Sequence, residues 1–226
     1  MKVRNLKKQI KNDIIYYLIT FYVLISFFLN LLKNYFHSDG FLDLLWFCNI
    51  VAIVLGLSML FRKKKAVTIC LVTSIPAQFL WIIDFFLELF GGGFGRTSFL
   101  FNEPIWVIAI STNLHVIIVP ASIYAVYKLG FARNILHYIL ILTFFILTAS
   151  FLLSDLNTNK NCVFYDCDSS ELPHGDEKFD YLGYFIINSL LFWMIVLTLN
   201  YYLLNYVISF FENKSKKSKR NQKSKS

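Results

Sequence analysis

The chain has 226 residues and a formal net charge of +8, and 57% of its residues are hydrophobic, 18% aromatic and 16% charged. A water-soluble domain could not bury so large an apolar fraction, so this composition excludes an ordinary soluble fold. Six stretches without Asp, Glu, Lys or Arg account for it, and each meets or nearly meets the roughly 20 residues that a helix needs to cross a bilayer. Because their polarity does not alternate as in a membrane barrel, the sequence predicts an all-α membrane protein, a six-helix transmembrane bundle.

The first element is a basic segment, residues 1–13, followed by a helix expected over residues 14–33. A basic start before an apolar run is also typical of a cleavable signal peptide. This apolar run is longer than the apolar region of a usual signal peptide, and no A-x-A cleavage pattern follows it. We therefore predict a retained helix.

The second and third helices are expected over residues 42–61 and 66–90. Near the end of the third, spacings of three and four residues place Trp81, Asp84 and Glu88 on one helix face. The glycine-rich turn that follows resembles a phosphate loop only superficially, because it lacks a preceding strand and a Gly-Lys-Ser/Thr ending. We interpret it as a flexible linker, with anion binding by its amides as the alternative.

The fourth helix, expected over residues 104–127, carries Asn113 and His115 ahead of Pro120. Pro120 predicts a kink, because proline cannot donate a backbone hydrogen bond. An ionisable side chain at membrane depth is energetically costly, so His115 is a candidate functional residue. Its imidazole needs a partner on at least one nitrogen, and Asp84 is the nearest acid by depth.

The fifth and sixth helices are expected over residues 134–154 and 181–211. The loop between them, residues 155–180, contains Cys162 and Cys167. On an oxidising side of the membrane we expect these two cysteines to form a disulfide, with a metal site or unpaired thiols as alternatives. We predict no metal site elsewhere and assign no cofactor.

Basic residues are divided unequally between the two sides that six helices create. The N-terminal segment, two turns between helices and the tail of residues 212–226 hold 18 of the 22 lysines and arginines. Cytoplasmic segments carry such an excess, so both termini are expected in the cytoplasm. The protein is then N-in and C-in, in the plasma (inner) membrane if the organism is bacterial.

Two of the basic segments are expected to contact anionic lipid headgroups. They are the turn of Arg62, Lys63, Lys64 and Lys65 and the tail between Lys214 and Lys225. A lysine-rich tail can also bind nucleic acid, but its position directly after a membrane helix favours a topology anchor. We predict membrane lipids and no nucleic acid as partners, and the sequence leaves homo-oligomer formation open.

In this orientation several polar or aromatic residues lie toward the outer side of the membrane. They are Asn49, Trp81, Asp84, Glu88, Asn113, His115 and Asn188. We expect them to line a cavity open to the outer leaflet, in which His115 is a general base, Asp84 orients it and the others contact substrate. The alternative is that the acids are simply hydrated at the interface and that the asparagines join neighbouring helices.

Four short patterns occur together between about residues 80 and 165: W-x-x-D, G-x-T, H…P and L-G-(Y/F). They are formed by Trp81 and Asp84, by the glycine turn with Thr97, by His115 with Pro120, and by Lys128-Leu-Gly-Phe131. In this combination the chain resembles a group of uncharacterised bacterial integral membrane proteins, although Phe131 and Ala132 stand where Tyr and Asp are expected. The resemblance implies a shared pocket and identifies no ligand.

Three functions fit these features, and the sequence leaves open whether the protein is an enzyme. The first is an enzyme that acts on a lipid or lipid-linked substrate at the outer leaflet. The second is a carrier or channel for a small solute or ion, and the third is a noncatalytic assembly or sensing protein. A missing internal repeat and few polar residues in the inner half disfavour the carrier, and we place the enzyme slightly ahead.

Overall fold

The computed structural model describes residues 2–37, 45–93, 97–154, 161 and 181–223, and every regular element in them is helical, as predicted. The elements in chain order are α1 (Lys2–His37), α2 (Phe47–Leu60), α3 (Lys64–Leu89), the 3-10 helix η2 (Ser98–Asn102), α4 (Ile105–Leu129), α5 (Leu136–Leu153), α6 (Leu182–Tyr184), the π-helix η5 (Phe185–Leu191) and α7 (Phe192–Lys223).

Five helical stretches in the described residues are long and apolar enough to cross a membrane. They are Asp13–Phe36 within α1, then α3, α4 and α5, and the continuous stretch Leu182–Lys214 formed by α6, η5 and α7. The remaining apolar helix, α2, has only 14 residues, which corresponds to a length of about 21 Å.

The start of α2 differs from the predicted range of residues 42–61, because the helix begins at Phe47 and Trp46 is its non-helical N-cap. Residues 42–44 lie outside the described part of the chain. Asn161 provides the physical reason: its Oδ1 accepts the Phe47 N–H at 2.8 Å, and its Nδ2 donates to the Leu45 carbonyl at 2.6 Å. A side chain from another loop thus satisfies the orphan backbone groups at this helix end.

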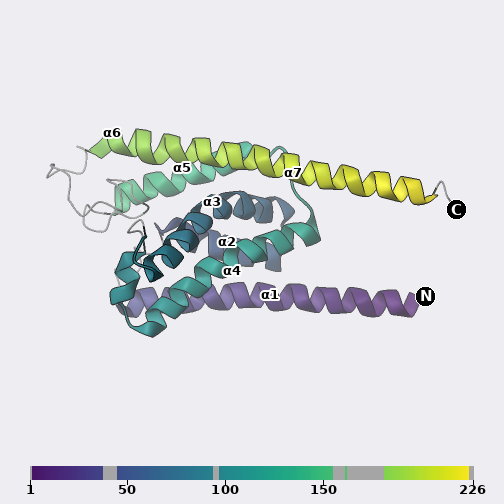
Figure 1. The fold of residues 1–226 in the computed structure, drawn as a ribbon, viewed down its shortest axis with the longest axis horizontal. Coiled ribbons are helices and arrows are strands. Elements are labelled where there is room, and N and C mark those ends of the chain that lie inside the picture. Colours follow the sequence, from purple (N-terminus) through teal and green to yellow (C-terminus); the bar gives the residue numbers. More distant parts are fainter. Residues whose placement is uncertain (1, 38–44, 94–96, 155–160, 162–180, 224–226) are drawn as a thin grey trace.

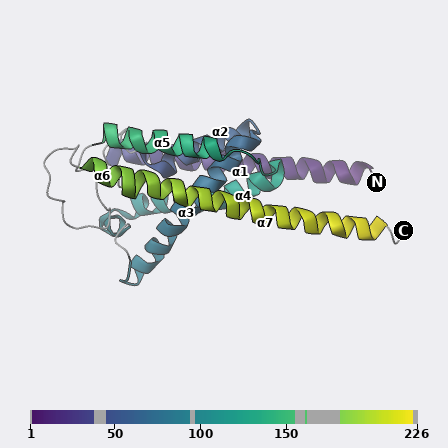
Figure 2. The same ribbon diagram turned by 90° about the horizontal axis from the view of Figure 1, so that it is seen from above.

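The helices form two layers (Figure 1). Helices α1 to α4 pack against one another as a central bundle, and α5 with the α6–η5–α7 stretch forms a second layer that packs on α3. In Figure 1, α1 and α7 lie on opposite sides of the central helices, and both extend past them at one end of the molecule. Both termini lie at that end, and the rotated view in Figure 2 agrees.

Contacts between distant segments gather basic residues at the end that holds the termini. Arg62 lies 3.7 Å from the carboxylate of Asp13, and Arg133 donates to Glu212 at 3.0 Å. We call this the basic end and the opposite one the far end. The basic end is defined by Asp13, Arg62, Lys63, Lys64, Lys65, Lys128, Arg133 and Glu212.

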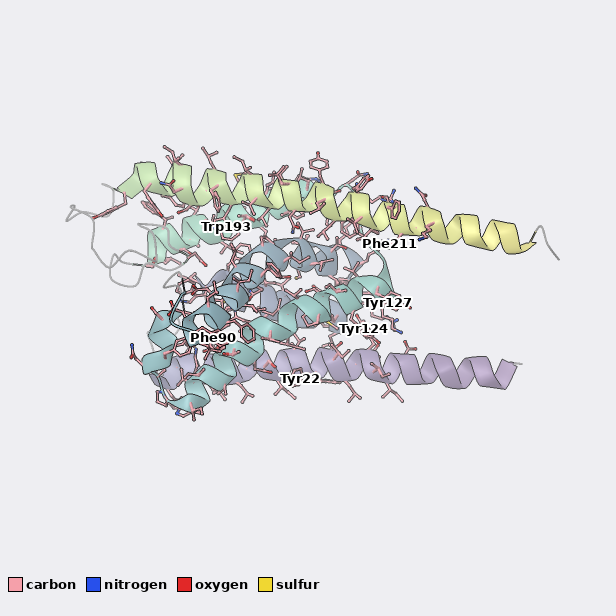
Figure 3. All side chains as sticks on the ribbon, viewed as in Figure 1. Tyr22, Phe90, Tyr124, Tyr127, Trp193 and Phe211 are labelled. Atoms are coloured by element: carbon pink, nitrogen blue, oxygen red, sulfur yellow. The ribbon has the colours of Figure 1, made fainter. Side chains whose placement is uncertain are left out.

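The sequence of α1 explains which side of it faces the bundle. Its buried residues recur at alternating intervals of four and three, the spacing of a seam along which two helices pack. They are Tyr16, Thr20, Val23, Phe27, Asn30 and Asn34, and Ser26 is buried beside Phe27. The intervening Leu18, Phe21 and Ile25 are exposed, and Figure 3 shows apolar side chains projecting from the outer faces of α1 and α7. In a membrane these faces contact lipid.

A proline inside α3 is compensated by a side chain of α7. Pro76 has no backbone N–H, so the carbonyl of Val72 one turn earlier lacks its usual helical donor. Asn200 Nδ2 donates to that carbonyl at 2.7 Å. The second layer is thereby fastened to the central bundle by a hydrogen bond at the position where the proline leaves an acceptor free.

Candidate functional site

A row of polar side chains joins α1 to α2 and α4. On α1 the row begins with Tyr22, whose hydroxyl donates to Asn113 Oδ1, and Asn113 Nδ2 in turn donates to Ser26 Oγ at 2.8 Å. Closer to the far end, Asn30 Nδ2 donates to Asn49 Oδ1 at 2.8 Å. We call this row the polar seam; Tyr22 is labelled in Figure 3. The seam contains two of the predicted pocket residues, Asn49 and Asn113.

The seam ends with a cation. Lys33 Nζ donates to Ser111 Oγ on α4 at 2.9 Å, and Ser111 stands one helical turn before His115 on the same helix. Lys33 is partly buried. The polar seam along α1 therefore leads to a positive charge beside the candidate base.

His115 is held by two residues of α3. Its Nδ1 lies 2.5 Å from Gln78 Oε1, and its ring stacks on Trp81 with centroids 3.9 Å apart and planes 3° from parallel. Gln78 is fully buried, whereas His115 is partly exposed. An amide oxygen can only accept, so the neutral imidazole carries its proton on Nδ1 and its lone pair on Nε2. Within the described chain Nε2 makes no hydrogen bond.

An aromatic row continues from His115 along α3. Trp81 stacks on Phe85 with centroids 5.4 Å apart, and Phe85 stacks on Phe101 of η2 at 5.5 Å. His115 and Gln78 each lie about ten residues from the far end of their helix, a depth of about 15 Å, and the aromatic row spans the distance from there to η2. The imidazole is thus fixed in orientation by stacking on one face.

Asp84 has a different partner from the predicted one. Its Oδ2 accepts hydrogen bonds from the backbone N–H and the hydroxyl of Thr97, at 2.7 and 2.8 Å, and its side chain is fully buried. The hydrogen bond of His115 goes to Gln78 instead. Asp84 lies six residues from Gln78, which is not a helical repeat, so the two side chains leave α3 in different directions. The carboxylate closes the connection between α3 and α4.

The other predicted site residues lie apart from His115 or outside the described chain. Glu88 packs against the backbone of Gly93 in the turn after α3. Asn188 is exposed on η5 in the second layer. Cys162 and Cys167 lie outside the described residues, so their predicted disulfide stays a prediction. The structure therefore brings Trp81 to His115, and Asn49 and Asn113 to α1, but does not gather all predicted residues into one group.

Sequence reasoning missed Gln78, Lys33 and the residues of α1. A signal for the latter was present, because Tyr22, Ser26 and Asn30 recur every four residues and therefore share one helix face. Gln78 stands three residues before Trp81, so both can reach the same neighbouring helix.

A shallow groove also lies on the outer face of α1, nearer the basic end, lined by Asp13, Ile14, Tyr17, Leu18 and Phe21.

Five long apolar helices and a surface rich in exposed apolar side chains define the class of protein: a multi-pass integral membrane protein. Comparisons of the chain with models of protein families, with curated proteins and with solved structures found no match.

Proposed function

We propose that the protein is a membrane-embedded enzyme that acts on a lipid or lipid-linked substrate at the outer leaflet, with His115 as its general base. The observation that carries this proposal is the hydrogen bond from Nδ1 to Gln78 Oε1, which leaves the Nε2 lone pair available to take a proton. Gln78 takes over the orienting role that the sequence analysis gave to Asp84. Trp81 holds the ring, and the charge of Lys33 favours an anionic substrate group.

The orientation in this proposal has six membrane crossings and both termini in the cytoplasm. Convergence of four basic segments at one end of the bundle supports it, because cytoplasmic ends retain lysine and arginine. The basic end then faces the cytoplasm and the polar seam lies in the outer half. The short α2 crosses as well, with local thinning of the bilayer or flanking residues making up the difference in length.

The patterns that carry the resemblance to uncharacterised bacterial membrane proteins contact one another. Trp81 of the W-x-x-D pattern stacks on His115 of the H…P pattern. Asp84 of the same W-x-x-D pattern binds Thr97 of the G-x-T pattern. Residues of different patterns thus meet in pairs, with one pair at His115 and the other at the connection between α3 and α4.

A noncatalytic assembly or sensing role is the second candidate. It is favoured by the polar seam, whose side chains form hydrogen bonds with one another between helices, as residues that hold membrane helices together do. They are Tyr22, Ser26, Asn113, Asn30 and Asn49.

A carrier has less support. The centre of the bundle toward the basic end is packed with apolar residues, among them Val67, Leu71, Ile118, Ala121 and Ala125, and offers a solute few polar contacts.

The test compares two histidine variants of the purified full chain in liposomes of total lipid from its native membrane. We expect His115→Ala to lower the rate of lipid conversion, followed by mass spectrometry, at least about 100-fold, the lower end for loss of a general base. The control is His137→Ala, on the exposed face of α5, and it should keep the parent rate. Unchanged conversion in His115→Ala, or no conversion by the parent chain, would refute the enzyme; copurifying partner proteins would then favour assembly.

A further inference from the structure

The basic end contains more positive charge than its acids neutralise. Asp13 is paired with Arg62, and Glu212 with Arg133. Among the residues that the structure describes, Lys63, Lys64, Lys65 and Lys128 have no carboxylate within ion-pair distance. Lys63 is the N-cap of α3, Lys64 and Lys65 are its first residues, and Lys128 lies in the last turn of α4.

One hydrogen bond joins the start of α3 to the turn after α4. The N–H of Ala132 donates to Thr68 Oγ1 at 3.0 Å, and both residues are buried. Gly130 has a φ of +86°, a conformation that glycine adopts without strain and that ends α4. The ammonium of Lys64 lies directly against this glycine, 3.2 Å from where a Cβ would stand. The lysines of α3 therefore lie beside the α4–α5 turn in a fixed arrangement.

Tyrosines accompany the unpaired charges. Lys65 Nζ lies 5.7 Å from the ring centre of Tyr138, and Lys128 Nζ lies 5.5 Å from that of Tyr124. Such contacts hold the lysine stems at the membrane boundary, where tyrosine also concentrates. Farther from the basic end, Ile123 of α4 and Ile141 of α5 are exposed. Each helix thus has an exposed apolar side chain close to its basic residues.

We propose that Lys64, Lys65 and Lys128 form a specific binding site for the headgroup of an anionic phospholipid. The three ammonium groups bind the phosphate, and Ile123 and Ile141 contact the acyl chains. A lipid fits this surface better than a free phosphate, because only a lipid uses the adjoining apolar side chains. Arg62 and Arg133 are not part of the site, since each already has a carboxylate partner. The site does not depend on His115 or on the proposed catalysis.

The experiment titrates the detergent-solubilised full chain with phosphatidylglycerol and follows bound lipid by native mass spectrometry. The variant K64Q/K65Q/K128Q should bind phosphatidylglycerol about 100-fold more weakly. It lacks three positive charges, and each basic residue near the headgroups adds a similar amount to the attraction for anionic lipid. The control K214Q/K216Q/K217Q removes the same charge from the tail and should change affinity only a few-fold. The charge-preserving K64R/K65R/K128R should keep the affinity, which shows that loss in the first variant does not come from misfolding.

Selective weakening in K64Q/K65Q/K128Q, with phosphatidylcholine bound poorly by the parent chain, supports the site. Equal weakening in both glutamine variants would overturn it, because the attraction would then be unspecific. Displacement of phosphatidylglycerol by inorganic phosphate, or tighter binding of a nucleic acid than of the lipid, would also overturn it.

Discussion

At the scale of single residues, the neighbours of His115 decide which nitrogen is reactive. Gln78 occupies Nδ1 and Trp81 covers one ring face, so both reduce the freedom of the imidazole without taking its second nitrogen. A glutamine in this place differs chemically from the predicted Asp84. A neutral amide accepts a hydrogen bond from the Nδ1–H group. It adds no negative charge, which would be costly to bury in hydrocarbon.

The tautomer of His115 can be measured directly. In a chain with His37, His137 and His174 replaced by Gln, 15N NMR of the remaining labelled histidine should show a protonated Nδ1 and a bare Nε2 at neutral pH. Gln78→Leu should allow the proton to move to Nε2, since nothing then holds it. Protonation of Nε2 in the chain that keeps Gln78 would contradict the proposed role of this residue.

The hydrogen bond from Asn200 to the Val72 carbonyl makes a second prediction. Asn200→Ala should lower stability by about 1 kcal/mol, the scale of an interhelical hydrogen bond in a membrane, as measured by reversible unfolding in mixed micelles. Combined with Pro76→Ala, which restores the backbone donor, the same change should cost little. Equal losses in both backgrounds would show that the proline does not create the need for Asn200. Asn205→Ala is the matched control on α7, because Asn205 Oδ1 has no partner in the described chain.

At the scale of elements, close packing of α1 on α2 depends on a glycine. A Cβ on Gly56 would stand 2.5 Å from Leu24 Cδ2 on α1, so a larger residue must displace that side chain or the helix. α3 and α4 are joined differently, by the stacking of Trp81 on His115, and Asp84 binds Thr97 in the connection between the two helices. These two helix pairs are thus held together by different kinds of contact.

Gly56→Leu should therefore destabilise the protein by about 1–3 kcal/mol, the usual cost of overpacking. Leu24→Ala should recover part of that loss by making room, and thermal unfolding of the single and double variants measures both effects. Gly183→Leu is the control, because a Cβ there meets open space. A Gly56→Leu protein as stable as the Gly183→Leu protein would contradict the close approach.

At the scale of the whole molecule, sequence reasoning recovered the helical membrane class because charge-free runs of membrane length are a strong signal. It also selected His115 and Trp81, since an imidazole deep in an apolar helix stands out. It could not find Gln78 as the partner, because the rotation of α3 against α4 decides whether Gln78 or Asp84 reaches the ring. Nor could it find Asn161 at the start of α2, because that contact joins a loop to a helix 114 residues away in sequence.

Six membrane crossings are the central claim, since with them the polar seam would lie in the outer half of the membrane and the proposed lysine site on the cytoplasmic side. Alkaline phosphatase fused after Lys63, after Asp168 or after Arg220 measures it, because the enzyme is active only outside the cytoplasm. We predict activity for the Asp168 fusion alone. Activity after Lys63 and Arg220, with none after Asp168, would show that the short α2 does not cross and would contradict both placements.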